Sequence, residues 1–214
     1  MTKRICFFIF LLSIASAGFA EPELRSGDII FQTSRSTQSY AIMWASKSVY
    51  SHVGIVEVDG KNMYVIEAIS KVSRTPFEKW IDRGKLGRYS VFRLKDMDAK
   101  KGKEVVAHSK SYIGRGYDIF FSSKNDEIYC SELVALAYEN SHLKIGKRQK
   151  VKELDTDNLV VRKLVEKRWR RHPVCRGKSK KFEDCWNLIL EDELVTPESI
   201  AQDEKLVKVW SNYP

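Results

Sequence analysis

Two apolar runs separated by a short polar stretch form the clearest pattern in the chain. The first run is SHVGIVEV (51–58), the second is MYVIEAI (63–69), and DGKN lies between them. Apolar residues in alternation on both sides of an Asp-Gly pair are typical of a β-hairpin. Three further strands are predicted at IIFQ (29–32), YSVFRL (89–94) and KLVKVW (205–210).

Helical spacing of apolar residues predicts a first helix over residues 36–47. Tyr40, Met43 and Trp44 share one face of this helix, and Ser36 is the expected N-cap. A second helix is predicted over residues 98–114, because an acidic cap begins the segment and a glycine ends it.

Three more helices are predicted in the second half of the chain. One covers residues 129–142, and the next starts at Asp155 or Thr156 and continues to about residue 170. The last has Thr196 as its N-cap and Pro197 in its first turn. Strands and helices are mixed without a regular β-α-β alternation, which predicts an α+β fold.

The predicted hairpin brings His52 close to Glu67. If Asp59 and Gly60 form the turn, the two residues lie directly opposite each other, with Cβ atoms about 4.5–5.5 Å apart. If the turn covers residues 59–62 instead, they are diagonal neighbours on the same face and remain within reach. A one-residue slip of the register would separate them.

Glu67 lies between Val65 and Ile69 on a strand face that is otherwise apolar. A buried carboxylate without a partner is costly, so Glu67 needs a donor or a cation, and His52 is the nearest candidate. The alternative is an exposed face on which Glu67 is simply solvated. Gly54 leaves space above the strand, where a substrate or another element could approach.

The N-terminus has the features of a secretory signal peptide. Lys3 and Arg4 precede an apolar run over residues 5–14, and Gly18 and Ala20 occupy the −3 and −1 positions of a cleavage site. Residues 1–20 are therefore predicted to be removed, with an uncleaved N-terminal anchor as the alternative. Residues 21–214 should form a single exported domain, periplasmic or secreted.

The chain is basic, with a formal net charge of +9 that falls to +7 when Lys3 and Arg4 are removed. A basic protein favours anionic partners such as cell-wall polymers or membrane surfaces. Nucleic acid is not expected, because it fits poorly with export and no helix-turn-helix or zinc-finger spacing is present. Much of the charge lies in residues 144–152 and 162–181, where solvated faces and loops are the simpler explanation.

Three cysteines remain after removal of the signal peptide. Cys175 and Cys185 flank a basic loop near residues 171–185 and are the natural disulfide pair, worth roughly 2–3 kcal/mol. Two free thiols or a zinc site with His172 are alternatives, although too few ligands are at hand for zinc. His172, in the same basic loop, is expected to face solvent.

Cys130 is the unpaired thiol, and it lies where the helix over 129–142 begins. Its helical stripe includes Leu133, Val134 and Ala137, which is also compatible with an inert packing cysteine. The start of a helix lowers thiol pKa values and can receive an oxyanion. Together with a His–Glu pair elsewhere in the chain, this position favours a nucleophilic role.

Six sequence blocks resemble the YiiX-like group of circularly permuted papain-fold proteins, relatives of the NlpC-type cell-wall hydrolases. The blocks are LRSGDIIFQ, YSHVGIVEV, YVIEAIS, YIGRGYDIFF, IYCSELVALAYE and VTPESIA, and they occur in that order from about residue 24 to residue 210. The resemblance implies a curved antiparallel sheet packed against helices, with the N-terminus of the cysteine-bearing helix facing the histidine strand. The segment around Cys175 to Cys185 looks peculiar to this sequence.

The resemblance also implies a cysteine hydrolase that cleaves an amide bond without a metal or cofactor. Cys130 would be the nucleophile, His52 the base and Glu67 its orienting partner, while Tyr117 matches a family position near the site. The implied substrate is a peptidoglycan stem peptide or another amide. The alternatives are a lipid-directed acyl hydrolase or acyltransferase with the same triad, or a ligand-binding module without catalysis.

Overall fold

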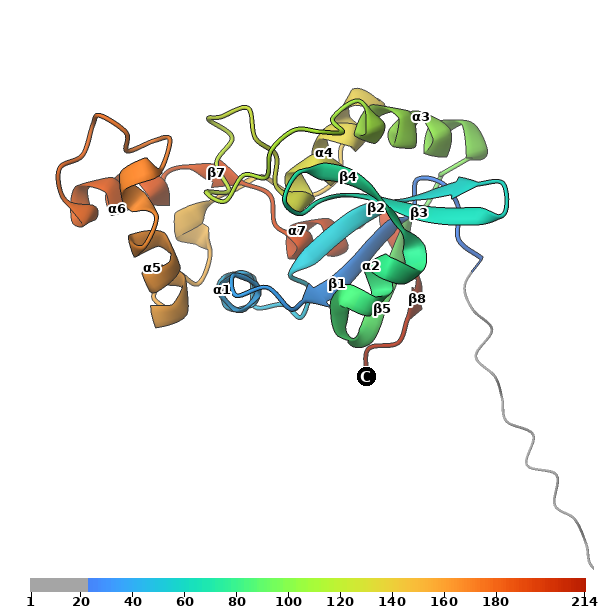
Figure 1. Cartoon of the computed structure of the whole chain (residues 1–214), viewed down its shortest axis with the longest axis horizontal. Helices are drawn as coiled ribbons and strands as arrows, with labels where there is room; N and C mark the ends of the chain where they lie inside the picture. The colour runs from blue at the N-terminus through green and yellow to red at the C-terminus, as the bar shows by residue number, and fades with distance from the viewer. Residues whose placement is uncertain (1–22) are drawn as a thin grey trace, which may run out of the picture.

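The computed structural model describes residues 23–214, and the predicted signal peptide lies outside them. At its centre is a six-stranded antiparallel sheet with strand order β4-β3-β2-β1-β5-β8 (Figure 1). The strands of this sheet are β1 (Ile29–Ser34), β2 (His52–Asp59), β3 (Asn62–Ala68), β4 (Val72–Pro76), β5 (Gly84–Leu94) and β8 (Leu206–Ser211). The mixed composition of the fold confirms the predicted α+β class.

Seven α-helices accompany the sheet in the part of the chain that the structure describes. They are α1 (Ser39–Ser46), α2 (Phe77–Arg83), α3 (Ala99–Lys110), α4 (Cys130–Asn140), α5 (Leu159–Glu166), α6 (Phe182–Leu190) and α7 (Pro197–Ala201). The short strands β6 (Gln149–Lys150) and β7 (Glu193–Leu194) pair with each other, and 3₁₀ turns cover Val151–Glu153 and Trp169–Arg171.

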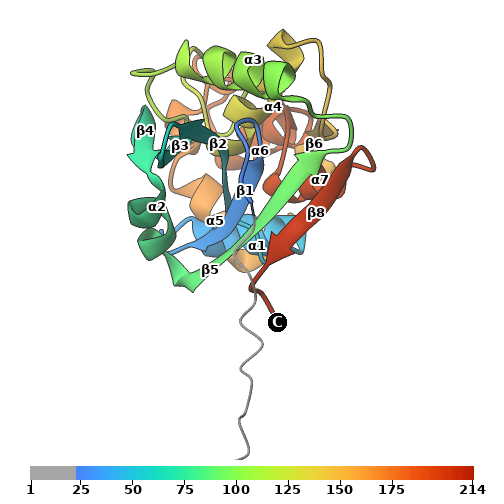
Figure 2. The ribbon, with the colours of Figure 1, turned by 90° about the vertical axis from the view of Figure 1, so that its right-hand side faces the viewer.

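The two faces of the sheet are covered by different helices (Figure 2). On one face α3 and α4 pack over β2 and β3, and Val53 and Ile55 join their core. On the other face α2 packs against β3, β4 and β5, and Val56 and Val65 share a core with Trp80 there. The alternation of side chains along β2 therefore divides the hairpin between two cores.

The hairpin has a different turn from the first of the two predicted. Asp59 pairs with Asn62 and Val58 with Met63, so Gly60 and Lys61 form the turn. Gly60 has φ 61°, a left-handed conformation that glycine adopts without steric cost. The prediction of an Asp59–Gly60 turn is wrong, and the register of the alternative, which makes His52 and Glu67 diagonal neighbours, is the one observed.

The first helix differs from the prediction at its start and in its exposed face. It begins at Ser39 rather than Ser36, and Gln38 occupies the N-cap position without a side-chain cap. Tyr40 and Trp44 are 57% and 55% exposed, because Ala41 and Ser39 provide the buried side. Helical spacing defined a common face correctly but could not say which face the protein buries.

The helix ends were predicted with mixed success. Asp98 caps α3 by accepting a hydrogen bond from Lys101 N, and Thr196 caps α7 by accepting one from Ser199 N, as expected. The helix expected from Asp155 or Thr156 is shorter, and Asn158 caps it as α5. Strand β4 and helix α2 were not predicted, because VSRTP lacks the apolar alternation of a strand.

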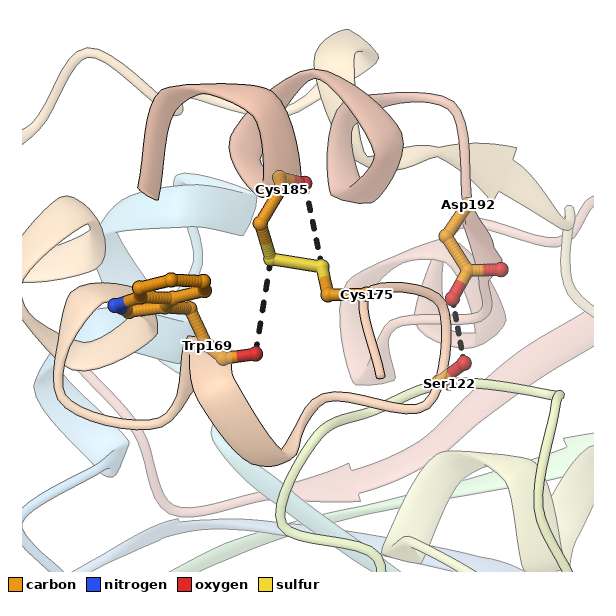
Figure 3. The surroundings of a disulfide bond; sticks show 5 residues. All are labelled: Ser122, Trp169, Cys175, Cys185 and Asp192. Atoms are coloured by element: carbon orange, nitrogen blue, oxygen red, sulfur yellow. Dashed lines mark hydrogen bonds between the residues drawn. A yellow bond between two sulfur atoms is a disulfide. The ribbon is translucent and has the colours of Figure 1, made fainter. Parts of the chain in front are cut away.

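Helices α5 and α6 belong to a separate lobe beside the sheet, and a disulfide joins Cys175 to Cys185 within it (Figure 3). Both sulfurs are buried with Ile189 in a small core of their own. His172, expected to face solvent, is 4% exposed instead and packs edge-on against Phe120. Pro173 and the neighbouring charges suggested a surface loop, but the contact with Phe120 buries the His172 ring.

No helix between residues 23 and 214 is long and apolar enough to cross a membrane.

Candidate functional site

His52 and Glu67 project from neighbouring strands toward the face that α2 covers. His52 is the first residue of β2, and its Nε2 lies 2.6 Å from Glu67 Oε2. Gly54 explains how the diagonal contact is made. A Cβ at position 54 would lie 3.4 Å from Glu67 Cβ and 2.5 Å from Val65 Cγ1, so only glycine leaves room for this crossing. The free space expected above Gly54 is therefore filled by the opposite strand.

Glu67 has no exposed surface, yet it is held as a carboxylate by three donors. In addition to His52, Thr75 Oγ1 donates to Oε1 at 2.5 Å, and Arg83 Nη2 donates to the same oxygen. Burial alone would raise the pKa of Glu67, but these hydrogen bonds and the positive charge of His52 hold it at about 2. The carboxylate is therefore charged at any physiological pH.

The imidazole of His52 is engaged on both sides. Glu67 occupies Nε2, the thiol of Cys130 is a second hydrogen-bonding neighbour of the ring, and the ring stacks on Trp80 with centroids 6.0 Å apart. Burial alone would lower the pKa of His52, but hydrogen bonds and charge from Cys130 and Glu67 raise it to about 9. The ring is thus in its imidazolium form at neutral pH.

Cys130 is the first residue of α4 and is a free thiol, 2% exposed. Neighbouring side chains fix the start of the helix. Ser131 Oγ donates to Val195 O at 2.9 Å, and Val195 N donates to Tyr129 Oη at 3.0 Å. The sulfur and the first unpaired N–H groups of α4 consequently lie together, which is an arrangement that can stabilise an oxyanion.

Tyr117 lies in the same neighbourhood and is oriented by two side chains that the sequence did not suggest. Gln38 Nε2 donates to Tyr117 Oη at 2.9 Å, while Arg168 Nη1 donates to Gln38 Oε1 at 3.3 Å and to Ile119 O at 2.7 Å. Burial and the nearby charge of Cys130 raise the pKa of Tyr117 well above its usual value. Because Gln38 supplies the donor, the tyrosine proton remains available to another acceptor.

A cavity lies between α1, α5, segment 119–121 and the start of α4; we call it the α1–α5 cavity. Cys130, Tyr129 and Ser131 form part of its lining. Its unfilled space, including the part open to solvent, is about 870 Å³. The thiol therefore faces the imidazole and also borders a space that a substrate could enter.

Known proteins share the sequence pattern and the fold of this chain. The sequence profile of the permuted papain-like amidases, YaeF/YiiX, matches residues 23–210. The chain belongs to this family. The YaeF/YiiX family consists of cysteine peptidase or amidase enzymes, and the chain is accordingly a hydrolase with a permuted papain-like fold.

Two relatives place the chain within the YaeF/YiiX family. YiiX of Escherichia coli (strain K12), described as an uncharacterized protein, is 33% identical over 216 residues, which cover all of this chain and 98% of the relative. The crystal structure of metalloprotein yiiX from Escherichia coli O157:H7 matches with a TM-score of 0.78 and 35% identity. That match covers 89% of this chain and 98% of the other.

The structure brings together four of the residues that the sequence singled out: Cys130, His52, Glu67 and Tyr117. It places Cys175 and Cys185 in a disulfide, away from the catalytic candidates. Sequence reasoning missed Arg83, Thr75 and Trp80, because all three lie in β4 or α2, which the apolar pattern did not reveal. Within residues 23–214, no group of three or more His, Cys, Asp and Glu side chains is arranged to hold a metal ion.

Proposed function

We propose that Cys130, His52 and Glu67 form a catalytic triad that hydrolyses an amide bond. The observation that supports it is the buried imidazole, which hydrogen-bonds the carboxylate of Glu67 and has the thiol of Cys130 as a neighbour. Membership of an amidase family supports the same reaction class and stands against a binding module without catalysis.

The reaction would proceed in two steps. The Cys130 thiolate attacks the carbonyl carbon, its backbone N–H at the start of α4 holds the oxyanion, and His52 protonates the amine as the C–N bond breaks. His52 then takes a proton from water, which attacks the thioester and releases a carboxylic acid and the thiolate. Glu67 holds the imidazole in place throughout, and Tyr117 would contact the substrate.

Two substrate classes are compatible with this chemistry. A stem peptide of peptidoglycan is supported by the basic charge of the chain, which favours an anionic cell wall or membrane surface, and by the predicted export to the periplasm or medium. An acyl lipid is favoured by the α1–α5 cavity beside the thiol, and the same intermediate could then pass its acyl group to water or to another acceptor.

Alkylation of Cys130 tests the triad without knowledge of the substrate. Iodoacetamide should modify Cys130 rapidly near neutral pH in the non-reduced protein, and His52→Ala should slow this reaction at least tenfold. Slow labelling that His52→Ala leaves unchanged would show that Cys130 is a packing thiol.

Product analysis then identifies the substrate class. Wild-type protein and Cys130→Ser should be incubated with purified muropeptides and, separately, with phospholipid vesicles, and the products identified by mass spectrometry. Fragments formed by wild type alone would identify the bond, whereas equal fragments from Cys130→Ser would contradict Cys130 as the nucleophile.

A further inference from the structure

The walls of the α1–α5 cavity are almost entirely apolar. Helix α1 contributes Ala41, Ile42 and Ala45, and α5 contributes aliphatic side chains that include Val161 and Leu164. Segment 119–121 adds an isoleucine and two phenylalanines. Among residues 23–214, no Asp, Glu or Lys side chain lines this space.

The few polar groups in the lining are already bound or uncharged. Ser131 donates to a main-chain oxygen, Thr196 caps α7, and Arg168 is held by Gln38 and Ile119. Burial lowers the pKa of His172, so it is neutral near pH 7, and burial raises the pKa of Tyr129, so it keeps its proton. Arg168 is the one permanently charged side chain among these lining residues, and its guanidinium is hydrogen-bonded to two neutral oxygens, Gln38 Oε1 and Ile119 O.

We infer that the α1–α5 cavity holds the alkyl chain of the acyl group that is transferred to Cys130, which makes long-chain acyl amides or esters the substrate class. This inference rests on the proposed triad and adds to it the identity of the acyl group. A chain seated in the cavity has its carboxyl end at Cys130, where the carbonyl carbon can meet the sulfur.

The chemistry of the lining selects between the two substrate classes. Most carboxylates and amides of a stem peptide would lose their hydration in this space, because Arg168 is the one charged side chain of the lining that could pair with them. An alkyl chain has no such loss, and each methylene that leaves water strengthens binding by about fourfold. The cavity therefore favours substrates according to the length of their apolar chain.

Much of the cavity wall comes from the disulfide-bearing lobe rather than from the sheet. Residues 151–189 supply Val151, Leu154 and Ile189 in addition to the α5 side chains. Val151 and Ile189 also pack against Cys175 and Cys185. The segment around Cys175 to Cys185, which looked peculiar to this sequence, supplies no lining residue itself but packs behind two residues of the wall.

A chain-length series tests the inference on catalysis. Acyl p-nitroanilides from acetyl to palmitoyl should be hydrolysed by wild-type protein with kcat/KM that rises by two- to fourfold per methylene until the cavity is full, and then levels off. Ala45→Phe, which fills the cavity from a half-buried position of α1, should reduce kcat/KM for the long-chain substrates at least tenfold. Ala99→Phe, the same exchange at the exposed start of α3, should behave as wild type.

A binding measurement makes the result independent of turnover. Cys130→Ser should bind cis-parinaric acid, and saturated fatty acids should displace it in order of chain length. Ala45→Phe in the same background should bind it at least tenfold more weakly. Leu164→Gln provides a second cavity variant if Ala45→Phe shows a changed circular dichroism spectrum.

The outcomes separate this inference from the proposed triad. Rapid, His52-dependent alkylation of Cys130 together with no dependence on chain length and no parinaric acid binding would overturn the alkyl-chain site and leave the triad standing. Slow alkylation with intact parinaric acid binding would contradict the triad alone. Acyl release from vesicles would identify a membrane lipid as the source of the chain, and cleavage of the dissolved p-nitroanilides alone would identify a free acyl amide; both results support the alkyl-chain site.

Discussion

Glu67 is a carboxylate without solvent contact, and its three donors come from three different elements. His52 lies in β2, Thr75 in β4 and Arg83 in α2. Leaving any buried charge with fewer partners is strongly unfavourable, so this cluster fixes the imidazole as firmly as it fixes the acid. The orientation of His52 is thereby determined before any substrate binds.

The pKa of His52 sets the pH dependence that we expect for hydrolysis. Because this pKa is raised to about 9, the imidazolium that protonates the leaving amine is present at neutral pH and is lost as the pH rises through about 9. Glu67→Gln removes one of the two groups that raise it. The alkaline fall of kcat should then begin at lower pH, and kcat itself should drop by about 10²–10⁴-fold.

A pH–rate profile of wild type and Glu67→Gln measures both effects. Glu78→Gln, an exposed acid in the first turn of α2, is the matched control and should leave the profile unchanged. An identical alkaline limb in Glu67→Gln would show that the carboxylate does not control the imidazole.

At this scale the sequence predicts the residues that carry the chemistry but not those that support them. His52 and Glu67 follow from strand alternation and Cys130 from its place at the start of a helix. Arg83, Thr75 and Gln38 are polar residues in segments without strong periodicity. Their positions depend on how distant parts of the chain meet, which local pattern does not encode.

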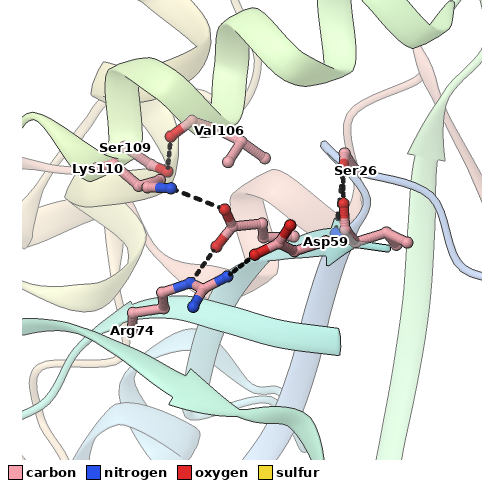
Figure 4. A network of polar contacts seen from close by, with 8 residues as sticks. Ser26, Asp59, Arg74, Val106, Ser109 and Lys110 are labelled. Carbon is pink, nitrogen blue, oxygen red and sulfur yellow. Dashed lines mark hydrogen bonds and ion pairs between the residues drawn. The ribbon is translucent and has the colours of Figure 1, made fainter. Parts of the chain in front are cut away.

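Among the secondary-structure elements, the β2–β3 hairpin is held by a second polar cluster on the face that α3 covers (Figure 4). Arg74 Nε of β4 donates to Glu57 Oε2 at 2.5 Å, and Lys110 Nζ of α3 donates to Glu57 Oε1 at 2.8 Å. Arg74 also reaches Asp59 near the turn, at 2.8 Å. Glu57 thus ties β2 to β4 and to α3.

Loss of the charge on Glu57 should destabilise the fold. Glu57→Gln leaves Arg74 and Lys110 without their carboxylate, and we expect a loss of about 1–3 kcal/mol in the free energy of unfolding, measured by urea denaturation at pH 7. Asp59→Asn, whose side chain is 65% exposed, is the control and should lose less than about 1 kcal/mol.

The free energy of unfolding of Glu57→Gln, measured as a function of pH, provides a second test of the role of Glu57. Burial alone would raise the pKa of Glu57, but Arg74 and Lys110 lower it below its usual value. Its contribution is therefore present above the unfolded pKa of about 4.3 and is lost as the pH falls. The stability of Glu57→Gln should fall less steeply below pH 5 than that of wild type, and equal slopes would contradict this role.

Some helix ends and strands can be predicted from the sequence, whereas the hairpin turn and the buried side of α1 cannot. Caps at Asp98 and Thr196 and the apolar runs of β2 and β3 are local signals, and they were predicted. The turn of the β2–β3 hairpin was misplaced by one residue, because either Asp59-Gly60 or Gly60-Lys61 can occupy it. The pairing of β2 with β1 and of β3 with β4 determines which register the hairpin adopts. The buried side of α1 depends on its contact with α5, which the chain makes only after folding.

For the whole molecule, the fold class and the family were predictable because ordered blocks extend over nearly the full chain. The α1–α5 cavity was not, since its walls come from segments as distant as residues 41 and 197. Each segment alone has the composition of an ordinary core.

The disulfide is a stability determinant that can be removed selectively. Replacing Cys175 and Cys185 by serine opens a short loop, so we expect a loss of roughly 2–3 kcal/mol and a fall of roughly 4–12 °C in Tm, measured by calorimetry. Wild-type protein treated with dithiothreitol should melt like the double variant, and the double variant should not respond to the reagent. An unchanged Tm would show that packing alone holds the lobe.

The disulfide between Cys175 and Cys185 packs against two residues of the cavity wall, Val151 and Ile189. This contact links the alkyl-chain site to the redox state of its surroundings. A disulfide forms and persists in an oxidising compartment. In the reducing cytosol, Cys175 and Cys185 would remain thiols, and the wall of the α1–α5 cavity would lack this cross-link. We expect the reduced chain to hydrolyse long-chain acyl substrates more slowly than the disulfide-bonded protein. If the predicted export takes place, the bond between Cys175 and Cys185 would form only after the chain has left the cytosol, and the proposed alkyl-chain site would be complete only then.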